Sequence, residues 1–133
     1  EKLTDSFFEE VCPNKYALTY LGRPGTWSEC GWMYYNLDNS IAREFLKRYE
    51  DIYILDKLEE LREPHDSFVF DHVMSTFEDQ SQFLNLNTNM KTNKHPFHES
   101  PLRKCLTHHK GHNKERKQEK MIKRYNLRDQ LGK

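Results

Sequence analysis

Three polar segments of the sequence hold the residues whose types and spacing could do chemistry. The first, residues 22–31, reads GRPGTWSECG and joins two segments rich in β-forming residues. Loops at the carboxyl ends of buried strands are where open α/β sheets bind ligands. Arg23 can bind a phosphate or carboxylate through two parallel hydrogen bonds, and Glu29 can accept hydrogen bonds from sugar hydroxyls or act as a base. A surface loop with a solvated acid explains the same pattern.

The second segment, residues 64–71, reads PHDSFVFD and places a His–Asp pair at the start of an expected helix. Such a pair could perform acid–base chemistry or bind an acceptor. Asp66 could equally cap the helix, and a capping role is compatible with chemistry. Asp71, five positions further on, is expected to be a solvated acid on another face.

The third segment, residues 108–114, reads HHKGHNK and contains the pattern H-x-x-G-x-x-K. The imidazole of His108 could bind a divalent metal ion. Gly111 would let the backbone approach a ligand closely, and Lys114 could neutralise a diphosphate. A polar stretch rich in histidine also produces this spacing by chance.

The same region leaves two other interpretations open. A zinc site is one, because its His and Cys spacings suit zinc, although the ligand types are mixed and no second cysteine pairs with Cys105. Its candidate ligands are His95, His98, Cys105, His108 and His112. A basic tail for nucleic acid is the other. The sequence argues against that partner, because Lys and Arg alternate with Gln and Glu, and only Tyr125 offers a stacking ring.

Composition limits the class of protein further. A length of 133 residues suits one domain, and eight Phe, seven Tyr and two Trp exclude full disorder. Residues 1–100 have 10 Lys and Arg against 18 Asp and Glu, whereas residues 101–133 have 11 against 3. An acidic body with a basic tail indicates a phosphate-rich partner or a solvated terminal helix.

The three cysteines are widely spaced and form no C-x-x-C, so a disulfide scaffold is not expected and a reducing compartment is. No apolar run approaches about 18 residues, and no signal peptide is visible, so the sequence predicts no membrane span and a cytoplasmic location.

These segments require a framework of helices and strands to position them. The pattern predicts a helix over 4–11, with Ser6 and Glu9 as a capping box, and strands over 15–21 and 31–37. The second strand is apolar at nearly every position, as is typical of a strand buried on both faces. A helix is expected to start at 38–40, a second helical stretch to end near 62, and a third helix to start at Asp66.

Beyond that helix the signal is weaker. Residues 83–86 could be a short strand, 87–94 a polar loop, and 114–131 a solvated helix or a partly disordered segment. This order predicts part of an α/β sheet. Two confident strands are too few for a complete sheet of that class, so the chain is expected to be the second half of a larger domain.

Taken in order, the segments resemble one family. LGRP at 21–24, SECG at 28–31, YNL at 35–37, HDSFVFD at 65–71, HPF at 95–97 and the His108–Gly111–Lys114 pattern resemble the C-terminal half of a GT-A-type, nucleotide-sugar-dependent glycosyltransferase. The resemblance is to uncharacterised bacterial and phage or viral members, distantly similar to glycogenin and lipopolysaccharide galactosyltransferases. It covers roughly residues 3–114, so residues 1–114 form the expected domain and 115–133 a basic helical or disordered tail.

The resemblance implies a Rossmann-like partial GT-A fold and a role for each matching residue. Glu29, Cys30 and Gly31 would contact the donor or acceptor sugar, and Asp66 would orient the acceptor. Three more positions match the donor side: His108 would help bind Mn²⁺ or Mg²⁺, and Gly111 and Lys114 would approach the donor diphosphate. The expected partners are a nucleotide sugar and a carbohydrate or glycoconjugate acceptor, in a bacterial cell or a virus-infected host.

The family's D-x-D metal motif, which follows an apolar strand in the N-terminal half, has no counterpart in this sequence. We therefore expect that half to be missing and the isolated chain to be inactive in glycosyl transfer. Two alternatives stay open: a non-catalytic binding module with a zinc site or a basic tail for nucleic acid or protein, and a degenerate transferase half kept as an interaction domain.

Overall fold

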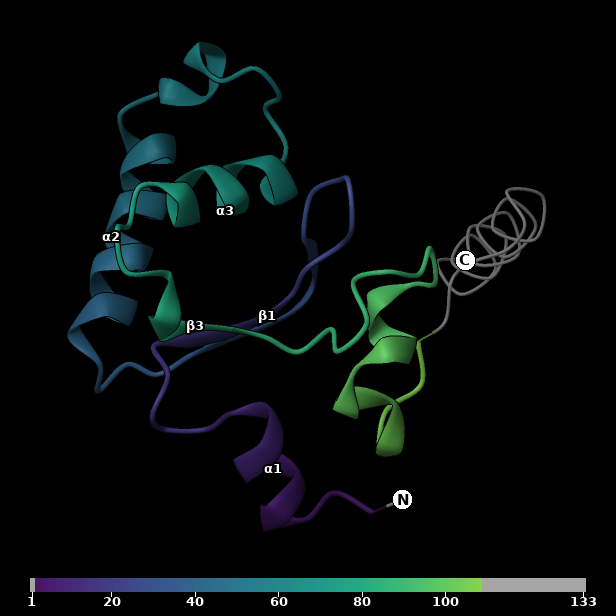
Figure 1. Cartoon of the computed structure of the whole chain (residues 1–133). Helices are drawn as coiled ribbons and strands as arrows, with labels where there is room; N and C mark the ends of the chain where they lie inside the picture. Colours follow the sequence, from purple (N-terminus) through teal and green to yellow (C-terminus); the bar gives the residue numbers. More distant parts are fainter. Residues whose placement is uncertain (1, 109–133) are drawn as a thin grey trace, which may run out of the picture.

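The computed structural model describes residues 2–108 of the chain, and Figure 1 shows how their elements are arranged. Three helices, three short strands and four 3-10 turns follow one another along the described residues. Their bounds are α1 Asp5–Val11, β1 Leu18–Leu21, β2 Glu29–Tyr35, α2 Ser40–Ile54, η1 Lys57–Glu60, α3 Asp66–Ser75, η2 Gln80–Gln82, β3 Phe83–Asn85, η3 Pro96–Glu99 and η4 Pro101–Lys104. The expected tail at 115–133 lies outside the described residues.

The three helices start where the sequence predicts, but α1 and α3 are capped by residues other than the expected ones. Thr4, not Ser6, caps α1, because its side chain accepts a hydrogen bond from the Phe7 amide at 3.3 Å. Asn39 caps α2 within the expected cluster, accepting from the Ile41 amide at 2.8 Å. His65 caps α3 through Nδ1, so Asp66 is the first residue of that helix rather than its cap. Each cap satisfies an amide that the helix leaves without a partner.

The helical stretch expected to continue to residue 62 is interrupted. α2 ends at Ile54, and Asp56 then adopts a left-handed backbone conformation with φ of 54°. A single 3-10 turn, η1, follows before the chain reaches α3. The left-handed residue redirects the chain, because an α-helix of L-residues cannot continue through that conformation.

The sheet is mixed, with strand order β2-β1-β3. β1 pairs antiparallel with β2 and parallel with β3, with Leu18 opposite Phe83. The fold is therefore α/β, as the order of elements predicts. β2 is half-buried along its length rather than buried on both faces. Within the described residues it forms an edge of the sheet, which explains its partial exposure.

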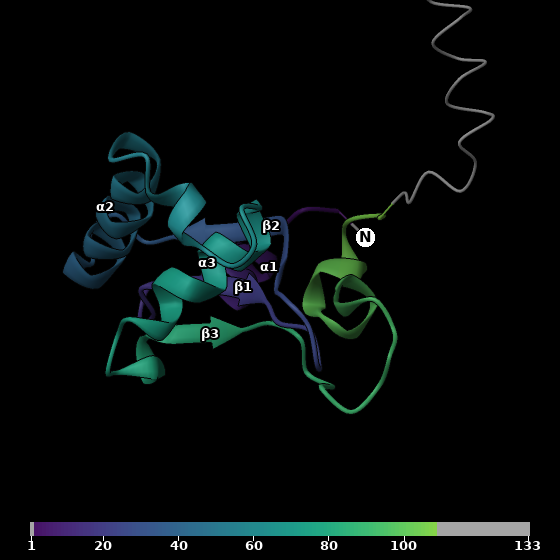
Figure 2. The same cartoon turned by 90° about the horizontal axis from the view of Figure 1, so that it is seen from above.

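Two apolar clusters cover the two faces of this sheet. Helices α2 and α3 pack on one face, around Phe45 and Phe70, and α1 packs on the other together with η3 and η4. Figure 1 shows these layers, with α2 and α3 above the strands and α1 below them. Figure 2, seen from above, shows the segment 86–108 beyond the ends of β1 and β3. Of the described helices, none combines the length and apolar character needed to cross a membrane.

The carboxyl ends of β1 and β3 are tied together by side-chain amides. Asn85 Oδ1 accepts from the Gly22 amide at 2.9 Å, and Asn87 Nδ2 donates to the Gly22 carbonyl at 2.8 Å. A Cβ atom at Gly22 would lie 2.5 Å from Asn85 Nδ2, so only glycine fits beside this amide. These hydrogen bonds fix the start of the loop 22–28 after β1 and the start of the segment that follows β3.

Candidate functional site

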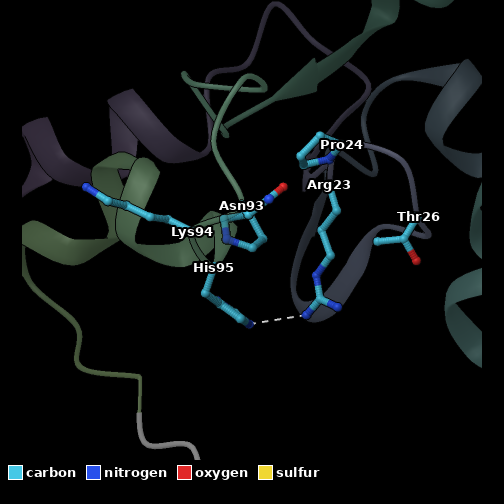
Figure 3. Close-up of a pocket in the computed structure, with 7 residues that line it drawn as sticks. Arg23, Pro24, Thr26, Asn93, Lys94 and His95 are labelled. Atoms are coloured by element: carbon cyan, nitrogen blue, oxygen red, sulfur yellow. Dashed lines mark hydrogen bonds between the residues drawn. The ribbon is translucent and has the colours of Figure 1, made fainter.

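A cavity of about 280 Å³ lies at the end of the sheet where β1 and β3 finish. Because those strands are parallel, the segments that follow them both leave from this end of the sheet. The carboxyl ends of strands are where α/β sheets commonly bind ligands. Figure 3 shows Arg23, Pro24 and Thr26 on one side of the cavity and Asn93, Lys94 and His95 on the other.

Arg23 and Glu29, predicted as site residues, lie together in this cavity region. The Arg23 guanidinium forms an ion pair with Glu29 Oε2 and lies with Nη2 3.2 Å from His95 Nε2. His95 Nε2 lies 3.0 Å from the same Glu29 oxygen. The side chains are largely shielded, with exposed fractions of 30%, 23% and 13% for Arg23, Glu29 and His95. Partial burial strengthens such an ion pair and orients all three groups.

His108 joins this group through its ring. It stacks on His95, with ring centroids 4.2 Å apart and planes at 19°, and packs against Phe97 at 5.5 Å. His98 contacts both imidazoles edge-on. The third predicted segment therefore meets the first, and the contact is indirect because His95 lies between Glu29 and His108.

Cys30 and Gly31, also predicted as sugar contacts, lie at the start of β2 but differ in surroundings. The β1–β2 pairing is irregular between the pairs Tyr20–Met33 and Leu21–Glu29. Extra residues of β2 lie between these two pairs, as in a β-bulge. Cys30 packs against the α2–α3 cluster, and burial raises the pKa of its thiol, so it stays protonated at neutral pH. The Gly31 amide is exposed and donates to Glu29 Oε1 at 3.3 Å.

Asp66 lies at the exposed start of α3, where its carboxylate accepts from the Ser67 amide at 2.8 Å. Its charge acts on Cys30, together with that of Asp71. Asp66 is thus close to the start of β2, but no described contact joins it to Arg23, Glu29 or His108. The structure brings the second segment to the same end of the sheet without joining it to the first cavity.

Asp71 was expected to be a solvated acid, and that expectation is wrong. Its carboxylate accepts from the Ser28 amide at 2.8 Å and from the Ser28 hydroxyl at 2.5 Å. Ser28 is 5% exposed, so these bonds satisfy two polar groups that burial removes from water. Asp71 holds the loop 22–28 against α3.

The described residues do not form a metal centre. No group of three or more His, Cys, Asp or Glu side chains in residues 2–108 is arranged to hold an ion. His95, His98 and His108 do gather, as the zinc alternative requires, but they interact ring to ring and His95 Nε2 faces Glu29. Cys105, another candidate zinc ligand, donates through Sγ to the Lys2 carbonyl at 3.5 Å. The last zinc candidate, His112, and the predicted diphosphate contacts Gly111 and Lys114 lie outside the described residues.

Comparison with known proteins assigns no family to the chain. No protein-family profile, curated protein or solved structure matches the chain.

Proposed function

We propose that this chain forms the acceptor- and diphosphate-facing part of a nucleotide-sugar-dependent glycosyltransferase of the GT-A type. One observation carries the proposal. Residues from separate segments, predicted to contact a donor or its metal ion, meet at the end of the sheet where β1 and β3 finish. Arg23 and Glu29 follow β1, and His95, 66 positions from Glu29, links them to His108. A shared site is what a single ligand would require of residues so far apart in sequence.

Arg23 is the group best placed to bind a phosphate. Its Nη2 is occupied by Glu29 and His95, but its Nε is buried and finds no hydrogen-bond partner among residues 2–108. A buried donor without an acceptor costs free energy, which a ligand oxygen would recover once the guanidinium turned its Nε toward the cavity. Lys94 extends away from Arg23 in Figure 3, and its amine lies 3.7 Å from Glu99. Among residues 2–108, the Arg23 guanidinium is therefore the cationic group oriented toward this cavity.

The divalent ion of this proposal has one candidate ligand among the described residues, His108. A Mn²⁺ or Mg²⁺ ion bound in such a site stabilises the charge of a diphosphate leaving group. Carboxylates, the ligands these ions prefer, do not gather with His108 in residues 2–108. The full ligand set would therefore include residues beyond that range.

The proposal is tested by incubating the natural protein that contains these residues with UDP-, GDP- and CMP-sugars and Mn²⁺. The free nucleotide released is measured with and without oligosaccharide acceptors. Metal-dependent release from one donor supports the proposal. Absence of both release and nucleotide binding, in a protein that is folded by circular dichroism, overturns it.

His108→Ala is expected to weaken Mn²⁺-dependent nucleotide binding at least about tenfold, because loss of one imidazole lowers the affinity of a metal site. Isothermal titration with UDP in the presence of Mn²⁺ or of EDTA measures the effect. His72→Ala is the control, since His72 is an exposed histidine in the last turn of α3. An unchanged Mn²⁺-dependent affinity in His108→Ala would show that His108 binds no metal.

Asp66→Asn is expected to lower turnover about tenfold or more while leaving donor affinity within about twofold, because misorienting an acceptor acts on the reaction step. Steady-state kinetics and nucleotide titration separate the two quantities. Asp5→Asn is a matched control, because Asp5 is likewise an exposed acid in the first turn of a helix. A fall in donor affinity without a fall in turnover contradicts the acceptor role.

A further inference from the structure

A second cavity lies on the other side of the loop that follows β1. It has a volume of about 540 Å³ and is lined by Gly25, Thr26, Trp27, Arg62 and Glu63. Thr26 also lines the first cavity, so one residue of the loop separates the two spaces. Trp27, Arg62 and Glu63 do not line the first cavity.

The indole of Trp27 is held in a fixed position at this cavity. Its Nε1 donates to Glu63 Oε2 at 2.8 Å, and its ring meets Phe68 of α3 edge-on with centroids 4.8 Å apart. The guanidinium of Arg62 lies over the ring, 5.4 Å from its centroid, so a ligand would stack on the part of the indole that Arg62 and Phe68 leave uncovered. Trp27 itself remains half-exposed. An aromatic ring that is fixed on one edge and half-open to water is a preformed binding surface.

Beside the ring, the cavity carries one positive and one negative group. Arg62 Nη2 donates to Glu63 Oε1 at 3.1 Å, and His65 Nε2 lies 2.8 Å from Glu63 Oε2. Hydrogen bonds from His65 and Trp27 lower the pKa of Glu63, which keeps it an acceptor at neutral pH. The Arg62 side chain is 72% exposed, so its remaining N–H groups are available to a ligand.

This combination suits a neutral pyranose. A sugar ring has a C–H face, whose weakly positive hydrogens match the negative face of an indole. Its hydroxyl groups need both acceptors and donors, which Glu63 and Arg62 supply side by side. Both cavities pair an arginine with a carboxylate, and what sets this one apart is the indole beside the pair. A nucleobase is the competing ligand, because a base can also stack on an exposed aromatic ring.

We infer that the Trp27–Arg62–Glu63 cavity binds the acceptor sugar, and that this sugar is neutral. The assignment as acceptor rests on the proposed glycosyltransferase function, whereas binding of a neutral sugar does not. The loop 22–28 then stands between a phosphate-binding side at Arg23 and a sugar-binding side at Trp27. Thr26, shared by both cavities, marks where donor and acceptor would approach each other.

The test uses tryptophan fluorescence. The sequence has two tryptophans, so a Trp32→Phe background leaves Trp27 as the only reporter. Trp32 packs in the α1-side cluster, away from the cavity lining. Methyl glycosides of glucose, galactose, mannose and N-acetylglucosamine are titrated, with uridine and glucuronic acid as comparisons. We expect a saturable change in emission for at least one neutral glycoside and a weaker response to uridine and glucuronic acid.

Glu63→Gln is expected to weaken that binding about tenfold, the usual effect of losing one hydrogen bond to a charged group. Glu60→Gln, at an exposed glutamate of η1 outside the cavity lining, should leave it unchanged. Because Trp27 anchors the loop, Trp27→Ala is examined only after circular dichroism shows that it folds. Saturable binding that both glutamate variants retain in full overturns the inference, and so does a response confined to uridine.

The two proposals fail in different ways. If UDP binds with Mn²⁺ but no glycoside changes Trp27 emission, the sugar cavity is wrong and the glycosyltransferase proposal stands. If a glycoside binds at Trp27 and no nucleotide binds, the chain has a sugar-binding site but the donor half of the proposal is wrong.

Discussion

Phe45→Ala is expected to lower the free energy of unfolding by about 3–5 kcal/mol, the usual cost of removing a buried aromatic side chain. Phe45 is fully buried in the middle of α2. Its ring lies within 6.4 Å, centroid to centroid, of five other aromatic rings from β2, α2, α3 and the segment up to β3. These are Tyr35, Tyr49, Phe70, Phe77 and Phe83. A cavity at that point would remove packing contacts from every layer on this face of the sheet.

Urea unfolding followed by circular dichroism measures the loss. Phe8→Ala is the control, because Phe8 is 46% exposed and its truncation should cost less than about 1 kcal/mol. Phe45→Leu should recover a substantial part of the stability, since it fills most of the volume. If Phe45→Ala and Phe8→Ala destabilised the protein equally, the α2–α3 cluster would not be the main core.

Asp71→Ala is expected to act on both stability and the site. Two hydrogen bonds to a partly buried carboxylate would be lost, and the Ser28 amide and hydroxyl would stay buried without partners. Bonds of this kind contribute roughly 1.5–3 kcal/mol, so we expect a loss of about 2–3 kcal/mol. Release of the loop 22–28 should also move Arg23 and weaken nucleotide binding at least about tenfold.

Asp79→Ala is a matched control for that variant. Asp79 accepts from the amide and hydroxyl of Ser81 just as Asp71 accepts from those of Ser28, but Asp79 is exposed and far along the chain from the loop. Its loss should cost less than about 1 kcal/mol and leave nucleotide affinity unchanged. Asp71→Asn, which keeps one carbonyl acceptor, should lie between the two. Equal nucleotide affinity in Asp71→Ala and the unmodified protein would show that the loop does not position Arg23.

The elements could be predicted from the sequence because their signals are local. The β-forming segments around 18–21 and 31–35, and the helical spacing through Phe45, each depend on side chains close in sequence. The caps were harder, because Thr4, Asn39 and His65 compete with equally suitable neighbours such as Ser6 and Asp66. The end of α2 could not be predicted, because a left-handed Asp56 leaves no pattern in the sequence.

The site was predicted in part. Arg23 lies in the loop 22–28 and Glu29 directly follows that loop, so their proximity follows from short spacing. The role of His95 depends on the parallel pairing of β1 with β3, and no local pattern reveals which strands pair. Asp71 was missed for the same reason, because its partner Ser28 lies 43 positions away. The GT-A relationship and its metal ion remain predictions.

The hydrogen bonds of Gly22 with Asn85 and Asn87 have a consequence for the order of folding. They join residues 63 and 65 positions apart, and the parallel β1–β3 pairing beside them closes a loop of similar length. Closing so long a loop costs entropy that only the packed α2 and α3 can offset. The helices and the β1–β2 hairpin, whose contacts are local, would form early, and Arg23 would meet His95 only in the last step. During synthesis, the first cavity would therefore stay open until residues beyond Phe83 had left the ribosome.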